Sequence, residues 1–250
     1  MKRRRGIYLL PNLFTTSALF AGFYAIVAAF NARYEPAAIA VFVAMILDGM
    51  DGRIARMTKT ESDFGVQYDS LSDMVSFGLA PALVVYQWSL HGLGKLGWLA
   101  AFIFTAAAAL RLARFNTQAG SADKRYFQGL PCPAAAAVVA GLVWFDSVGQ
   151  PVDEATMVVF AFALTVLVGL LMVSNIRYHS FKQIDLHGKV PFLSVLFIVL
   201  VIALVAVRPS LVLFLLALTY AVSGPLMTLV LIRRHRSKRI SADSREQAAD

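Results

Sequence analysis

The chain has 250 residues, of which 58% are hydrophobic and only 15% are charged, whereas a soluble domain carries about a quarter charged residues. A net charge of +8 would point to nucleic acid as the partner of a soluble protein. In a membrane protein it is explained by the excess of lysine and arginine on cytoplasmic loops. We therefore expect membrane lipids around the chain and no nucleic-acid partner. A single cysteine, Cys132, excludes an intramolecular disulfide.

Uncharged stretches close to the roughly 20 residues that cross a bilayer as a helix recur along the whole chain. They predict an all-α, polytopic membrane bundle with about eight transmembrane helices, over residues 9–31, 36–57, 65–90, 96–118, 132–149, 154–174, 190–207 and 210–232. We expect residues 1–232 to form one membrane domain. Residues 233–250 form a basic, polar cytoplasmic tail in this interpretation, and we expect residues 241–250 to be disordered.

The distribution of basic residues predicts the orientation of these helices. Short connections follow the first, third, fifth and seventh predicted helices, and longer polar connections follow the second, fourth and sixth. With a cytoplasmic N-terminus, only Arg33, Lys95 and Arg208 lie on the far side, which leaves 20 of the 23 lysines and arginines inside. Since basic residues favour the cytoplasmic side, both termini are expected in the cytoplasm.

Two pairs of aspartates lie within the second and third predicted helices: Asp48 with Asp51, and Asp69 with Asp73. Ionisable side chains are costly inside a membrane, so they normally face the bundle interior and mark a functional site. Spacings of three and four residues place each pair on one helix face. The short cytoplasmic connection between the helices brings both pairs to a similar depth. Ion pairs with the neighbouring arginines would neutralise at most two of the four carboxylates.

Carboxylate ligands without a nearby cysteine or histidine indicate a hard cation, with Mg²⁺ and Mn²⁺ preferred and Ca²⁺ as a further candidate. Two such ions would balance four carboxylates and leave coordination positions for a diphosphate. Gly52 and Ala55 leave their helix face bare, so a ligand can approach the backbone. Arg56 can hold phosphate oxygens in a bidentate fork. The residues themselves therefore predict phosphoryl or phosphatidyl transfer at the cytoplasmic membrane surface.

The segment from Asp48 to Asp73, DGMDGRIARMTKTESDFGVQYDSLSD, resembles the signature of the CDP-alcohol phosphotransferase family. That signature is D-x2-D-G-x2-A-R, eight residues, then G-x3-D-x3-D, and every fixed position matches. The resemblance implies a homodimer with a six-helix catalytic core in each subunit. It implies that the first three aspartates hold the metals, while Asp73 lies near a metal and takes the proton of the acceptor hydroxyl. It also implies contacts with the CDP-linked lipid from Asn12, Thr15, Gly52, Ala55, Arg56 and Gly65.

Three further segments, PNLFT (11–15), RLARFN (111–116) and FQGLPCP (127–133), resemble the branch of this family that uses L-serine. The resemblance implies an enzyme of the bacterial cytoplasmic membrane. That enzyme would transfer the phosphatidyl group of CDP-diacylglycerol to L-serine and release CMP. Serine needs a cation for its carboxylate and a hydrogen-bond acceptor for its ammonium group. Candidates for contacts with the acceptor or with phosphate are Arg111, Arg114, Asn116, Arg177 and Lys182.

Two alternatives remain open. The same chemistry could use another acceptor, such as glycerol phosphate, inositol phosphate or choline, although a phosphorylated acceptor would require several more cations. An ion-coupled transporter also places aspartates in helices. Transporters bind near the bilayer midplane on interrupted helices, whereas these aspartates lie toward the cytoplasmic helix ends. The sequence therefore favours an enzyme over a transporter.

Overall fold

A computed structural model of the chain describes residues 9–58, 62–118, 126–149, 153–179 and 192–246. The α-helices are α1 (Leu9–Phe30), α2 (Tyr34–Thr58), α3 (Asp63–Asp73), α4 (Ala80–Trp88), α5 (Lys95–Gln118), α6 (Cys132–Val148), α7 (Glu154–Val173), α8 (Phe192–Val207) and α9 (Pro209–Glu246). A π-helical turn, η2 (Met74–Leu79), joins α3 to α4, and a 3-10 turn, η3 (Leu90–Leu93), precedes α5. Two short strands complete the described elements, β1 (Tyr126–Gln128) and β2 (Arg177–His179).

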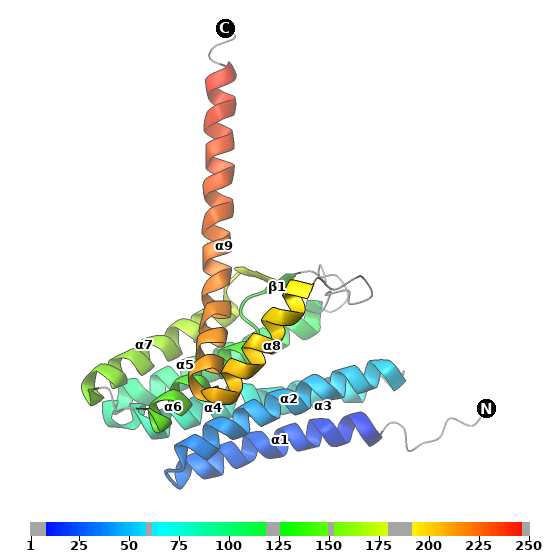
Figure 1. Cartoon of the computed structure of the whole chain (residues 1–250), viewed down its shortest axis with the longest axis vertical. Helices are drawn as coiled ribbons and strands as arrows, with labels where there is room; N and C mark the ends of the chain where they lie inside the picture. The colour runs from blue at the N-terminus through cyan, green and yellow to red at the C-terminus, as the bar shows by residue number, and fades with distance from the viewer. Residues whose placement is uncertain (1–8, 59–61, 119–125, 150–152, 180–191, 247–250) are drawn as a thin grey trace, which may run out of the picture.

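Within the described residues, helices occupy every predicted segment, and α3, η2 and α4 together form the third (Figure 1). In the part of the chain that the structure describes, four helices are long and apolar enough to cross a bilayer, over Pro11–Phe30, Lys95–Thr117, Glu154–Val173 and Pro209–Val230. The helical membrane class is therefore confirmed. The number of eight spans and the six-helix core stay predictions. Helices α2 and α3 carry the four aspartates, two on each helix.

Helices α1 and α2 pack closely against each other because small residues line the interface. Buried alanines occupy both helices, and small side chains let helix backbones approach in a membrane. The turn between the helices uses Ala32 in the left-handed region, at φ 55°. The N–H of Arg33 donates to the carbonyl of Ala28 at 2.9 Å, which closes the end of α1 in the manner of a Schellman motif.

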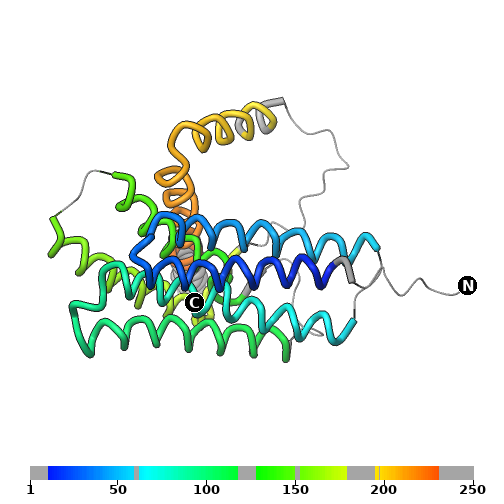
Figure 2. The backbone as a smooth tube through the Cα atoms, turned by 90° about the horizontal axis from the view of Figure 1, so that it is seen from below, coloured from blue at the N-terminus to red at the C-terminus, as the bar shows by residue number. Residues whose placement is uncertain are grey.

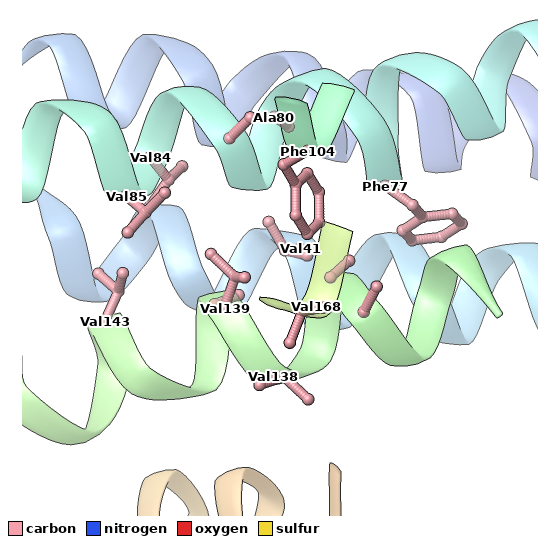
Figure 3. Packing of buried hydrophobic residues seen from close by; sticks show 14 of the residues in the cluster. Val41, Phe77, Ala80, Val84, Val85, Phe104, Val138, Val139, Val143 and Val168 are labelled. Atoms are coloured by element: carbon pink, nitrogen blue, oxygen red, sulfur yellow. The ribbon is translucent and has the colours of Figure 1, made fainter. Parts of the chain in front are cut away.

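The apolar core lies where α2, α4, α5, α6 and α7 meet (Figure 3). Val41, Val84, Phe104, Val139 and Val168 are all buried there. These side chains come from five different helices, so packing at this point fixes the arrangement of the bundle. The carboxylates of α2 and α3 are consequently carried on a rigid frame.

The π-helical turn directly follows Asp73. Serine side chains in the turn and just before it bind this segment to α1. The hydroxyls of Ser72 and Ser76 donate to the carbonyls of Thr15 and Ala18, each at 3.1 Å. A Cβ added to Gly22 would lie only 2.6 Å from Oγ of Ser76. Single π-helical turns inside α-helices occur frequently at functional sites. Here the turn coincides with the end of the aspartate-bearing helix.

A short antiparallel ribbon, which the sequence analysis did not predict, joins two of the longer connections. Phe127 of β1 lies opposite Tyr178 of β2. Next to it, the N–H of Gly129 donates to the carbonyl of Ile176 at 2.9 Å, and Gly129 has a positive φ of 77°. A Cβ at this glycine would meet the carbonyl oxygen of Met172. The ribbon pairs backbone groups of the two connections, and it fastens the start of α6 to the end of α7.

Helix α9 rises steeply across the direction of α1 and α2 (Figure 1). It crosses α6 where Gly141 lies against Phe214, and the hydroxyl of Tyr178 donates to the carbonyl of Ala221 at 2.9 Å. The prediction of disorder from residue 241 is wrong as far as Glu246, because α9 continues to that residue. Its last 14 residues include no glycine or proline that would end a helix.

Candidate active site

The four aspartates lie at the end of the bundle where α1 begins. The C-terminal half of α2 and the whole of α3 run beside α1 there (Figure 2). Helix α3 begins after Ser62, whose hydroxyl oxygen accepts the N–H of Gly65 at 3.1 Å, as is usual for an N-cap. This cap fixes the start of the helix about three turns before Asp73.

Three carboxylates meet in one cluster. One oxygen from each of Asp48, Asp51 and Asp69 lies within 4.8 Å of the other two. Asp51 is only 5% exposed, and the other two are partly buried. Asp73 lies within hydrogen-bonding reach of Asp48 and within electrostatic range of Asp51 and Asp69. The structure therefore brings together all four aspartates that the sequence singled out.

The donor set of this cluster fits a hard divalent cation. It offers carboxylate oxygens from two different helices, which is the ligand type that Mg²⁺ and Mn²⁺ prefer. Four carboxylates this close repel one another strongly where water is scarce. A cation between them would remove that repulsion. Asp48, Asp51 and Asp69 would hold it, with Asp73 beside them.

Thr15, predicted to contact the CDP-linked lipid, lies beside Asp51. Its side chain is 4% exposed, and Oγ1 lies 2.7 Å from Oδ2 of Asp51. The same oxygen lies 3.2 Å from the carbonyl of Pro11. The threonine hydroxyl can therefore donate a hydrogen bond to the Asp51 carboxylate and fix the orientation of that carboxylate. Thr15 therefore contacts a candidate metal ligand, and its contact with the CDP-linked lipid stays a prediction.

We expect Thr15→Val to raise the Mn²⁺ concentration for half-maximal activity by about 10-fold to 100-fold, the usual effect of losing an outer-shell partner. Thr15→Ser, which keeps the hydroxyl, should stay near the wild type. The measurement is a metal titration of activity. Thr165→Val, at a buried threonine of α7, is the matched control. An unchanged metal requirement in Thr15→Val would contradict the orienting role.

The remaining residues predicted to contact the CDP-linked lipid lie around the cluster. Gly52 is exposed, and a Cβ added there would meet nothing within 4 Å. Arg56 is exposed and Ala55 is partly buried on the same helix. A Cβ on Gly65 would lie 3.8 Å from Oδ1 of Asn12, so these two residues adjoin. The glycine-bearing surface of α2 is therefore open to a ligand.

Arg111 and Arg114, three residues apart on α5, have different surroundings. Arg111 is 8% exposed, and its Nη1 donates to Sγ of Cys132 at 3.4 Å. Among the described residues, its Nε has no hydrogen-bond partner, and no carboxylate forms an ion pair with the guanidinium. Arg114 instead donates to the carbonyls of Val173 and Ser174 at 3.0 and 3.5 Å. A cation there suits the C-terminal end of α7.

Of the other acceptor candidates, Asn116 holds two helices together. Nδ2 of Asn116 donates to Oγ of Ser70 at 3.0 Å, which links α5 to α3. Arg177 is exposed on β2 opposite Gln128. Lys182 lies outside the described residues. Of the five candidates, Arg111 is the one whose charge is both buried and without a carboxylate partner in the described part of the chain.

Two residues near Arg111 were not predicted. Cys132 is fully buried and lies within electrostatic range of both Arg111 and Asp73. Tyr220 of α9 lies within electrostatic range of Arg111. The FQGLPCP segment contains Cys132 and could have identified it. No sequence signal connected Tyr220, more than 100 positions along the chain, with this site.

The helical membrane bundle combines a cluster of carboxylates, an exposed glycine on α2 and a buried arginine, Arg111. These are the parts of a transferase for phosphate-linked substrates. A family model described as CDP-alcohol phosphatidyltransferase matches residues 8–169. The chain belongs to this family, so the resemblance predicted from the aspartate signature is confirmed. Elements β2, α8 and α9 lie beyond the matched residues.

Curated relatives agree with this assignment. The chain is 40% identical over 203 residues to a CDP-diacylglycerol–serine O-phosphatidyltransferase of Helicobacter pylori, covering 81% of this chain and 84% of the relative. A protein of the same name from Bacillus subtilis is 30% identical over 174 residues, covering 70% and 92%. One from Methanocaldococcus jannaschii is 38% identical over 143 residues, covering 57% and 63%.

Proposed function

We propose that this enzyme transfers the phosphatidyl group of CDP-diacylglycerol to the hydroxyl of L-serine, giving phosphatidylserine and CMP. The observation that carries the proposal is the cluster of Asp48, Asp51 and Asp69 beside Asp73. The names and coverage of the relatives support serine as the acceptor. The distribution of basic residues supports a reaction at the cytoplasmic face of the bacterial cytoplasmic membrane, with both termini inside.

Asp73 is the general base in this proposal. It accepts the proton of the serine hydroxyl while the serine oxygen forms a bond to the β-phosphorus of CDP-diacylglycerol. The bond from that phosphorus to the bridging oxygen breaks, and CMP leaves with this oxygen. Two divalent cations, Mg²⁺ or Mn²⁺, held by Asp48, Asp51, Asp69 and Asp73, would neutralise the charge of the diphosphate. The proximity of Asp73 to the three-carboxylate cluster supports its role.

The CDP portion of the lipid binds over the open face of α2 in this proposal. Gly52 leaves room for a ligand next to Asp51, and the exposed Arg56 supplies a cation for phosphate. Ala55, Gly65 and Asn12 complete this surface. Thr15 orients the Asp51 carboxylate through its hydrogen bond.

Arg111 holds the carboxylate of serine in this proposal. A buried charge without a counter-ion is costly, and the acceptor supplies a negative group of the right chemistry. Arg114 and Asn116 serve mainly to hold α7 and α3 against α5, as their hydrogen bonds indicate. Arg177 and Lys182 remain candidates for contacts with lipid phosphate. The family resemblance further supports a homodimer.

We expect Arg111→Gln to raise the KM for serine about tenfold or more, because a hydrogen-bonded charged contact contributes about 1.5–3 kcal/mol. The KM for CDP-diacylglycerol should change little. Arg114→Gln is the matched variant on the same helix, and it should lower thermal stability without changing the serine KM. An unchanged serine response in Arg111→Gln would reassign this residue to lipid or phosphate contact.

The test of the proposed function is CMP release by the purified protein supplied with CDP-diacylglycerol, divalent metal and one alcohol at a time. We expect release with L-serine and little with glycerol phosphate, inositol phosphate or choline. Release in detergent, without any gradient, would also exclude transport as the main activity. Preferential release with another alcohol would overturn the assignment of serine while leaving the phosphatidyl-transfer chemistry intact.

A further inference from the structure

The Cys132 thiol lies between the Arg111 side chain and the backbone of the helix that carries Arg111. Cys132 is the first residue of α6 and is fully buried. Its Sγ accepts an N–H from Nη1 of Arg111 at 3.4 Å. The same sulfur lies 3.9 Å from the carbonyl oxygen of Ala108, to which the S–H can donate. The thiol is thus the one side-chain partner that the described residues provide for this guanidinium.

The surroundings of Arg111 are unfavourable for a cation unless an anion joins them. The N-terminus of α6 carries the positive end of a helix dipole, and the guanidinium lies beside its first residue. Arg111 is 8% exposed. Within the described ranges, its Nε has no hydrogen-bond partner and its guanidinium has no ion pair. A helix N-terminus and a buried guanidinium together form an anion-binding arrangement.

We propose that Cys132 is a positioning residue that holds the Arg111 guanidinium in place for an anionic group of the acceptor. This inference rests on the proposed function and extends it to a residue outside the aspartate signature. The sulfur engages one N–H group and leaves the others, including that of Nε, for the carboxylate of the acceptor. A carboxylate at position 132 would neutralise Arg111 and compete with the substrate. A thiol is a weak, uncharged acceptor, so it orients the guanidinium without cancelling its charge.

The first test compares Cys132→Val, which removes the acceptor by replacing the thiol with two methyl groups, with Cys132→Ser, which keeps a donor and an acceptor. We expect Cys132→Val to raise the KM for L-serine about tenfold, as expected for the loss of a hydrogen bond to a charged group. The kcat and the KM for CDP-diacylglycerol should stay near the wild-type values. Cys132→Ser should restore most of the serine affinity.

A double-mutant cycle separates positioning from packing, because residues that act through one another have non-additive effects. In an Arg111→Gln background, Cys132→Val should cause no further rise in the serine KM. Val139→Ala, at a buried residue of α6, is the control for lost packing. It should lower the melting temperature and leave the serine KM unchanged.

The inference would be overturned by an unchanged serine KM in Cys132→Val, by an equal rise in both substrate KM values, or by full additivity with Arg111→Gln. A rise confined to the KM for CDP-diacylglycerol would also overturn it, since the anion at Arg111 would then be a phosphate. All these measurements start from a wild-type enzyme that releases CMP with serine. If the wild type does not do so, the proposed function itself fails.

Discussion

Asp73→Asn is expected to lower kcat by about a thousandfold, within the range of 10²–10⁴ that general-base catalysis contributes. The amide has nearly the same size as the carboxylate but cannot accept the proton of the serine hydroxyl. Asp48, Asp51 and Asp69 remain in place in this variant, so some metal and CDP-diacylglycerol binding should persist. Single-turnover CMP release measures the chemical step, and the rise of melting temperature with Mn²⁺ and CDP-diacylglycerol measures binding.

The matched control is Asp63→Asn, at an exposed aspartate in the first turn of the same helix. It removes the same charge from α3 and should leave turnover close to the wild type. Full activity of Asp73→Asn would refute the role of Asp73 as the base. A complete loss of metal and lipid binding would assign Asp73 mainly to the metal cluster.

Asp69→Ala is expected to remove metal dependence and activity together. One of the three clustered carboxylates is lost, and a bound cation contributes several kcal/mol to charge stabilisation in the transition state. Since each 1.36 kcal/mol corresponds to a factor of ten, the loss should be at least about a thousandfold. The same result is expected for Asp48→Ala. Titration of activity with Mg²⁺ and Mn²⁺ provides the measurement.

Thermal stability separates this loss from unfolding. The cluster places like charges close together, so removing one carboxylate should not lower the melting temperature of the metal-free protein. Metal should raise the melting temperature of the wild type and have little effect on Asp69→Ala. A variant that retains metal-dependent turnover, or one that melts at a much lower temperature without metal, would contradict the assignment of Asp69 as a ligand.

Several features of this protein could be predicted from the sequence because they depend on local pattern. Long apolar runs predict membrane helices, since backbone polar groups must be satisfied within the segment in lipid. Spacings of three and four place Asp48 with Asp51, and Asp69 with Asp73, on common faces at any tertiary arrangement. The fixed positions of the signature lie within 26 consecutive residues. The family could therefore be recognised without any knowledge of packing.

Other features depend on contacts between distant segments, and only the tertiary structure decided them. Thr15 and Asp51 are 36 residues apart, and their hydrogen bond exists because α1 packs against α2. Arg111 and Arg114 are the same residue type on one helix. Their surroundings differ only because of their positions: Arg111 reaches the start of α6, and Arg114 reaches the end of α7. A guanidinium has the same chemistry in either place, but its burial and partners determine whether its charge is left for a substrate.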